Sequence, residues 1–406
     1  MRTNRSTETA DRYLFTRNLG ELQKQAGVER EVAELVVAHA RLCADKRRPV
    51  DFYQNTSSSI PWNFALGKLL KRDPDLDPHA QQFFVAYNRA MHARRLPTIY
   101  SKEHLAARLE VTTKQLDWLA YSPDRYRTFY IPKANGESRR VDEPVEKLKT
   151  VQRWILHRIL DKLPTHRAAQ GFRHRRSILT NARKHVRRQV IVRIDLEDFF
   201  PSLSFRQARS VFVKAGYPFT VANVLANLCC RDGVLPIGAP TSPTLANQIC
   251  RKMDNRLWLL GRTSRFRYSR YADDLVFSSA NRRFASLVPF LKQVVTEEGF
   301  RVNENKLAIL RRAGCQKVTG VVVNRKTNVS REQFKWVRAV VHNCQKNGLE
   351  VEFPKWCEHM AKAGKEVPAD IETFGRQLAG QIAFIRHINR KRGDKLWKQF
   401  RQIEFV

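Results

Sequence analysis

The spacing of apolar residues changes near residue 125. Before this point apolar positions recur at helical spacing, first between Val28 and Lys46 and again between Phe83 and Met91. The polar or proline-containing segments 55–59 and 72–78 separate the two patterns and resemble loops. We therefore expect residues 1–95 to form a helical N-terminal extension that carries no chemistry of its own.

Residues 101–120 show two short helical patterns around Val111-Thr112-Thr113. A pair of this kind is similar to a helix-turn-helix, which reads duplex DNA, but it also occurs as a small structural pair of helices. The sequence favours the structural interpretation and leaves the other open.

Beyond residue 125, strand patterns arranged as hairpins combine with helical patterns, which is typical of an α+β domain. The segment 126–141 is typical of a β-hairpin, because Asn135-Gly136 suits a tight turn. A strand is expected at 189–196 and a second hairpin at 265–279. The remaining expected elements are helices in 144–163, 204–230 and 283–298, strands near 306–311 and 317–323, and a mostly helical basic segment, 330–406.

Charge adds a functional constraint. The 406 residues include 74 Lys and Arg against 39 Asp and Glu, a formal net charge of +35. Such an excess opposes compaction by self-repulsion, and a polyanionic partner would relieve it. Nucleic acid fits best, although a merely basic surface is the simpler alternative. A dense run of arginines between Arg173 and Arg193 is interleaved with apolar residues, which suggests a groove for a duplex and not a disordered tail.

Cysteine usage and hydropathy bear on the cellular compartment. The seven cysteines form no CxxC pair, so reduced thiols are expected and a zinc site is not. The N-terminal segment lacks an apolar signal core, and no run of about 18 apolar residues occurs. We expect a soluble, cytoplasmic protein without a membrane partner.

The candidate chemistry lies in three aspartates. Asp195 follows the apolar strand residues 190–194, and Asp273-Asp274 occupies the middle of the hairpin 265–279. Adjacent carboxylates repel each other, and a divalent cation would relieve that repulsion. If the two segments are neighbouring strands, Asp195, Asp273 and Asp274 could hold two Mg²⁺ ions about 4 Å apart for in-line phosphoryl transfer. An ordinary acidic turn and an unrelated acid are the alternative.

With these residues the chain resembles a reverse transcriptase. Tyr271-Ala272-Asp273-Asp274 matches the YADD box of that family. Four further segments match in the family's order, namely 131–140, 195–200, 235–247 and 299–310. The resemblance implies a right-hand polymerase fold, with fingers and palm in 96–325 and a helical, RNA-binding thumb in 326–406. It also implies an RNA-directed DNA polymerase whose catalytic residues are Asp195, Asp273 and Asp274.

The same resemblance implies a site for deoxynucleotides. Lys133 and Arg139 would grip the triphosphate, and Lys306 occupies the family's usual lysine position. Phe200 could exclude a 2′-hydroxyl by steric conflict, and Gly238-Ala239 would let the nucleotide approach the backbone closely. Solvated charges and a core phenylalanine are the alternatives.

Two motifs narrow the resemblance to retron reverse transcriptases: Asn181-Ala182-Arg183-Lys184-His185 fits an NAxxH pattern, and Val318-Thr319-Gly320 a VTG box. The family implies a structured non-coding RNA that serves as template and primer. Synthesis would start at a guanosine 2′-hydroxyl, give branched RNA-linked DNA and act in phage defence with an effector protein. Asn181, His185, Arg386, Arg390 and Lys391 are the expected RNA-binding residues, although His185 could equally cap a helix or lie in the core. The alternatives are an intron, diversity-generating or abortive-infection reverse transcriptase, or an RNA scaffold with a polymerase fold.

Overall fold

The computed structural model describes residues 78–132, 136–364 and 366–403. The helical pattern expected between Val28 and Lys46, and most of the expected extension, lie outside these residues. The chain divides into two units. One comprises the described part of Met1–Ile131, Ser138–Thr165 and Phe200–Ile249, and the other comprises the described part of Pro132–Glu137, His166–Phe199 and Cys250–Val406.

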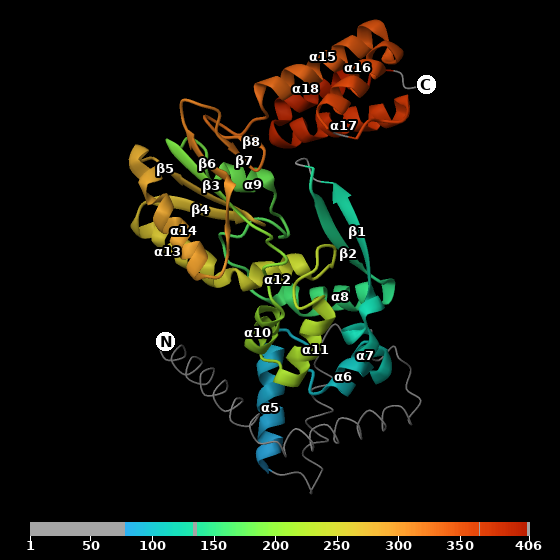
Figure 1. The fold of residues 1–406 in the computed structure, drawn as a ribbon, viewed down its shortest axis with the longest axis vertical. Coiled ribbons are helices and arrows are strands. Elements are labelled where there is room, and N and C mark those ends of the chain that lie inside the picture. The colour runs from blue at the N-terminus through green and yellow to red at the C-terminus, as the bar shows by residue number, and fades with distance from the viewer. Residues whose placement is uncertain (1–77, 133–135, 365, 404–406) are drawn as a thin grey trace, which may run out of the picture. The chain divides into compact units, whose positions relative to one another are not determined.

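The first unit is mainly helical and carries one hairpin (Figure 1). Its elements are α5 (Pro78–Ala93), α6 (Lys102–Arg108), α7 (Thr113–Tyr121), η1 (Pro123–Arg125), β1 (Tyr126–Pro132), β2 (Ser138–Pro144), α8 (Glu146–Arg158), η2 (Leu160–Lys162), α10 (Phe205–Ala215), α11 (Phe219–Cys229) and α12 (Ser242–Ile249). The pair of helices expected in 101–120 is confirmed. Its helices begin where Ser101 and Thr112 cap them, because each side chain accepts a hydrogen bond from the backbone N–H three residues on.

The second unit is built on a four-stranded sheet with the order β4-β5-β3-β6. Its elements before the C-terminal helices are α9 (Ile178–Arg183), β3 (Val190–Leu196), α13 (Arg251–Thr263), β4 (Phe266–Tyr271), β5 (Asp274–Ser279), η3 (Arg282–Leu287), α14 (Val288–Glu297), β6 (Val302–Arg311), β7 (Lys317–Val318) and β8 (Val321–Val322). The paired strands within the sheet run antiparallel. The strand expected at 189–196 and the hairpin expected at 265–279 are therefore confirmed.

The two faces of this sheet have different partners because side chains alternate along a strand. On β4, the buried Tyr268 and Arg270 bond to Asp254 of α13. Ser269 points the other way and bonds to Asn181 of α9. Figure 1 shows α13 and α14 packed together beside the sheet, with α9 near its other side.

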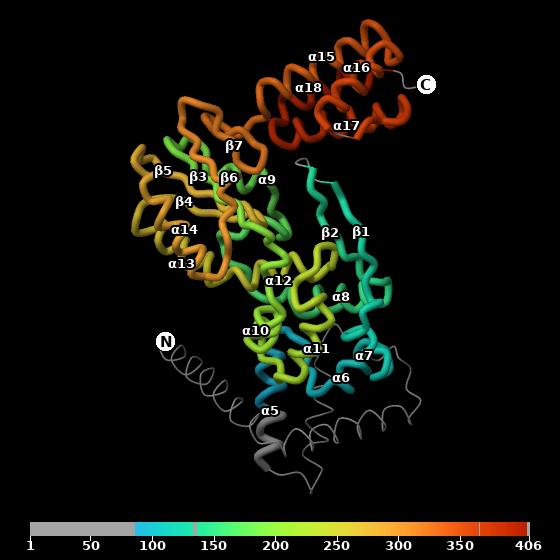
Figure 2. The backbone as a smooth tube through the Cα atoms, in the orientation of Figure 1, coloured from blue at the N-terminus to red at the C-terminus, as the bar shows by residue number. Residues whose placement is uncertain are grey.

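The C-terminal helices are α15 (Arg331–Asn347), α16 (Leu349–Lys362), α17 (Ile371–Ile388) and α18 (Arg390–Phe400), and their path is clear in Figure 2. The buried rings of Trp356 and Phe374 pack against each other in their core, with ring centroids 5.1 Å apart. This core is continuous with Leu179 of α9 and with Ile191 and Val276 of the sheet. The expectation of a mostly helical segment after residue 330 is confirmed.

Two further findings concern the cysteines and the length of the apolar helices. The cysteines that the structure describes are all free thiols, as expected, and Cys229, Cys230 and Cys250 are buried. Within the described ranges, no helix is both long and apolar enough to cross a bilayer.

Candidate active site

Asp195 and Asp274 lie directly opposite each other on β3 and β5. Residues paired in this way in antiparallel strands have Cβ atoms about 4.5–5.5 Å apart on the same face of the sheet. Asp273 is the residue before β5, in the two-residue turn that leaves β4. Its carbonyl accepts a hydrogen bond of 3.1 Å from the Leu196 N–H, which fastens the turn to β3. The strand register therefore brings the three predicted aspartates to one end of neighbouring strands.

Two cations neutralise these carboxylates. Lys306 Nζ lies 3.0 Å from Asp195 Oδ2, and Arg193 Nε lies 3.4 Å from Asp274 Oδ1. Lys306 reaches Asp195 from a bulge, because Arg193 pairs with Ala308 whereas Asp195 pairs with Asn303. Two residues along β3 thus correspond to five along β6, and a bulge of this kind redirects side chains.

Burial raises the pKa of Asp274 to about 6. Arg193 opposes this shift, whereas the negative charges of Asp273 and Asp195 add to it. Desolvation and like charge both disfavour an ionised carboxylate, and a nearby cation favours it.

The donor set suits a hard divalent cation, because carboxylate oxygens are the ligands that Mg²⁺ prefers. Among the described residues, no three or more His, Cys, Asp or Glu side chains are gathered closely enough to hold a metal ion as they stand. The carboxylates of Asp195 and Asp274 are turned to Lys306 and Arg193 instead. A metal ion that binds at this site would therefore replace Lys306 and Arg193 as the cations next to these carboxylates.

The turn that carries Asp273 rests on a buried ion pair. Arg270 donates to both carboxylate oxygens of Asp254, at 2.9 and 2.8 Å, and both side chains are fully buried. The guanidinium also donates to the carbonyl of Ala272 at 3.1 Å. Ala272 has a φ of +56°, in the left-handed region that non-glycine residues rarely adopt. Asp254 and Arg270 thus stabilise an unfavourable backbone conformation next to Asp273.

A second support comes from the segment before α9. The Arg270 N–H donates to the Ala168 carbonyl, and the Gln170 N–H donates to the Arg270 carbonyl. Gly171 approaches the turn so closely that a Cβ placed there would lie 2.8 Å from the Ala272 nitrogen. Only a glycine fits at this distance without displacing the backbone.

Comparison with known proteins decides the family. Residues 131–358 match the family described as "Reverse transcriptase (RNA-dependent DNA polymerase)". The chain is 33% identical over 352 residues to the retron Mx162 reverse transcriptase of Myxococcus xanthus, covering 77% of this chain and 69% of that protein. It is 36% identical over 253 residues to the retron Ec86 reverse transcriptase of Escherichia coli, covering 61% and 79%. The chain belongs to the retron reverse transcriptase family.

The protein is therefore an RNA-directed DNA polymerase. It uses divalent metal ions to copy an RNA template into a DNA product. The expected right-hand polymerase fold is confirmed at the level of the family. The structure is also similar to the telomerase of Candida albicans, with a TM-score of 0.40, 10% identity and coverage of 68% of this chain and 63% of that one.

The residues that we expect to bind nucleotides in this reverse transcriptase have different environments. Lys133 lies outside the described residues. Arg139 is exposed on β2, and Phe200 is half-buried in the turn after β3. Gly238 has a φ of +116°, and a Cβ there would lie 2.8 Å from the Asp142 carbonyl, so the fold itself requires this glycine. Ala239 is buried, which leaves its side chain little surface for a nucleotide.

The expected RNA-binding residues fall into two groups. Asn181 and His185 have no exposed surface, although the motif suggested direct contact. Both nitrogens of His185 lie 2.7 Å from hydroxyls, Nδ1 from Ser278 and Nε2 from Ser269. Ser269 in turn donates to Asn181 Oδ1 at 2.6 Å. This geometry fits the alternative of a core histidine, and the two residues tie α9 to β4 and β5.

The second group lies on the C-terminal helices. Arg386, Arg390 and Lys391 are exposed where α17 meets α18. Asp394 bonds to Arg386 at 2.6 Å and lies 3.6 Å from Arg390, so part of this positive charge is already compensated. Their surface position is compatible with binding RNA, which stays a prediction.

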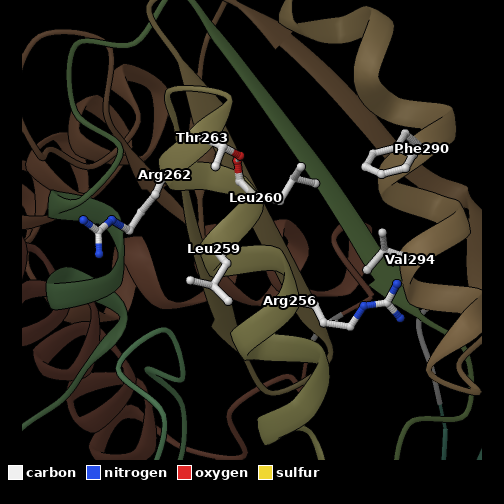
Figure 3. A pocket seen from close by; sticks show the side chains of 7 residues that line it. All are labelled: Arg256, Leu259, Leu260, Arg262, Thr263, Phe290 and Val294. Atoms are coloured by element: carbon white, nitrogen blue, oxygen red, sulfur yellow. The ribbon is translucent and has the colours of Figure 1, made fainter.

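An open pocket of about 710 Å³ lies between α13 and α14, and none of the three aspartates lines it (Figure 3). Leu259 and Phe290 expose apolar surface there. Its lining residues are Arg256, Leu259, Leu260, Arg262, Thr263, Phe290 and Val294, which offer no carboxylate for catalysis.

Proposed function

We propose that the protein copies part of a structured non-coding RNA into branched RNA-linked DNA, with Asp195, Asp273 and Asp274 holding two Mg²⁺ ions. The observation that carries the proposal is the register of β3 and β5, which sets Asp195 opposite Asp274 with Asp273 next to it. When bound, the two ions would activate the primer hydroxyl and stabilise the departing pyrophosphate. The relatives named retron reverse transcriptases support the choice of product.

The protein's own residues would prepare this site. Lys306 and Arg193 hold the carboxylates of Asp195 and Asp274 in place, and both would turn to phosphate oxygens once the metal ions occupy the carboxylates. The backbone bond from Leu196 to the Asp273 carbonyl fixes the third aspartate relative to the first. Positioning of this kind supplies most of the catalysis in phosphoryl transfer.

We keep nucleotide contact as a proposal for Lys133, Arg139, Phe200 and Gly238. Arg139 is an exposed cation on a hairpin strand, which suits a phosphate contact. We also propose that the RNA product complex acts in phage defence with an effector protein, on the strength of the family relationship alone.

The test is the nucleic acid that copurifies from the native host. Treatment with a 2′–5′ debranching enzyme before a denaturing gel should convert a branched RNA–DNA species into separate RNA and DNA. The Asp273→Asn variant should copurify RNA without DNA, because it removes a metal ligand and leaves the fold intact. Linear DNA that resists debranching would instead indicate another class of bacterial reverse transcriptase, and DNA synthesis by Asp273→Asn would exclude the assigned site.

A further inference from the structure

Three arginine side chains gather around Lys184 within the second unit. Arg173 Nη1 donates to the carbonyls of His166 and Ala169, at 3.2 and 3.1 Å. Lys184 Nζ donates to the carbonyl of Arg167 at 3.3 Å. Arg167, Arg173 and Arg176 are all near enough for their charge to act on Lys184. We call Arg167, Arg173, Arg176 and Lys184 the cation cluster.

In the part of the chain that the structure describes, the cation cluster has no acidic counterpart. Within the described part of the chain, none of its four members forms an ion pair with a carboxylate, and its polar contacts go to neutral backbone carbonyls. Asp254 is the acid that acts on the neighbouring His166, and its carboxylate is already committed to Arg270. Among the described residues, these four like charges are held together without a carboxylate, although Arg167 lies over the ring of Trp258, 5.0 Å from its centroid.

This arrangement has a cost that an anion would remove. Lys184 is half-buried, and burial together with the three arginines lowers its pKa to about 8. Desolvation and like charge both disfavour a charged amine, whereas a bound anion favours it. Arginine suits phosphate because its planar guanidinium can donate two parallel hydrogen bonds.

We propose that the cation cluster binds the backbone phosphates of an RNA strand. Several separate cations match a chain of phosphates better than they match one small ion. The choice of RNA over DNA rests on the proposed function. An enzyme that copies RNA must hold the RNA strand before any DNA exists.

The cation cluster lies next to residues 168–171, the segment that contacts the turn carrying Asp273. Arg173 is bonded to the carbonyl of Ala169, and Ala169 forms a parallel bridge to Arg270. Gly171, two residues further on, contacts Ala272. A strand bound to the cluster would therefore hold the same segment, residues 166–173, that supports Ala272.

The test measures binding of the full-length protein to a labelled 20-nucleotide single-stranded RNA over a range of KCl concentrations. The double variant Arg176→Gln/Lys184→Gln should bind about 10-fold more weakly near 0.15 M salt. The slope of log K against log salt should become shallower by about 1.4, since each lost contact to a single strand contributes about 0.7. Arg158→Gln/Lys162→Gln, two exposed cations of the first unit, removes the same charge and should leave the slope unchanged.

Further arms identify the ligand. The difference between the two double variants should be at least as large with RNA as with DNA of the same sequence, and it should persist in millimolar inorganic phosphate. Equal slopes for the two double variants on RNA would overturn the proposal, as would a difference confined to DNA or abolished by millimolar inorganic phosphate. Thermal unfolding confirms that both proteins are folded. Extension of a preannealed primer by the wild-type protein reports the polymerase activity separately, so that its failure would not be mistaken for failure of the phosphate site.

Discussion

Arg270 and Asp254 form a two-pronged ion pair without exposed surface, and the same guanidinium holds the carbonyl of Ala272. Arg270, three residues before Asp273, thus connects helix α13 to the turn that carries Asp273. Desolvation makes a buried pair of this kind a poor source of net stability, because hydrophobic residues of similar volume often replace such pairs without loss. Its value here lies in positioning the turn that carries Asp273.

The pair can be tested by removing one partner or both. Arg270→Met or Asp254→Leu alone leaves a buried charge unpaired, which should cost about 3–5 kcal/mol of unfolding free energy. The double variant should recover most of that stability and yet show a kcat for primer extension at least about 10-fold below wild type, because Ala272 has lost its support. Its KM for deoxynucleotides should change little, whereas general misfolding would also change KM. A double variant with wild-type kcat would show that the pair does not position the turn.

Gly171 offers a test from the opposite side of the turn. Gly171→Ala adds a methyl group where only 2.8 Å separates it from the Ala272 nitrogen, so the turn or residues 168–171 must shift. We expect a loss of about 10-fold in kcat, since displacements near 1 Å are costly in positioned catalysis. Gly380→Ala is the matched control, because a Cβ there meets nothing within 4 Å and a helical Gly→Ala change should raise stability slightly. Equal kcat for the two variants would contradict the assigned contact.

The buried side chain of His185 should make the stability of the folded protein depend on pH. Burial, with smaller contributions from Lys184, Arg267 and Arg188, lowers its pKa to about 3. The unfolded chain therefore binds a proton below about pH 6.5 whereas the folded protein does not until about pH 3, so stability is lost as the pH falls through this window. Between pH 7.5 and 5.5 this single group should reduce the unfolding free energy by about 1.4 kcal/mol.

The measurement is urea unfolding of the wild type and of His185→Gln at both pH values. The variant keeps a donor and an acceptor near Ser278 and Ser269 but cannot titrate in this range. Its stability should depend less on pH than that of the wild type, by about the stated amount. Because residue 185 is buried, the affinity of the folded variant for RNA should change little. An unchanged pH dependence, or a large specific loss of RNA affinity, would contradict this account.

The sequence predicts the local features of the site better than its packing. The hairpin around Asp273 and the strand before Asp195 were predicted because alternation and turn residues are local signals. The burial of Asn181 and His185 could not be predicted, since their partners Ser269 and Ser278 lie 84 to 93 residues away in the sequence. The motif marked both positions and gave no indication of whether they face RNA or the core.

The residues missed altogether show the same limit. Asp254 belongs to no motif. The sequence indicates its burial only by placing an acid on one helix with the apolar residues Met253 and Leu257. Gly238 was assigned to nucleotide approach, whereas the structure shows that contact with the Asp142 carbonyl already requires it. The bulge that brings Lys306 to Asp195 depends on pairing between distant strands, which spacing does not reveal. The division into extension, fingers-palm and thumb stays a prediction.

The ion pairs of Asp195 with Lys306 and of Asp274 with Arg193 have a consequence for the resting enzyme. Many clustered carboxylates need a bound ion to stay together, but two of these three carry their own compensating charge. The fold of this site therefore does not depend on a bound ion. At the proposed metal site, loading of the ions would then be a separate and reversible step that follows folding.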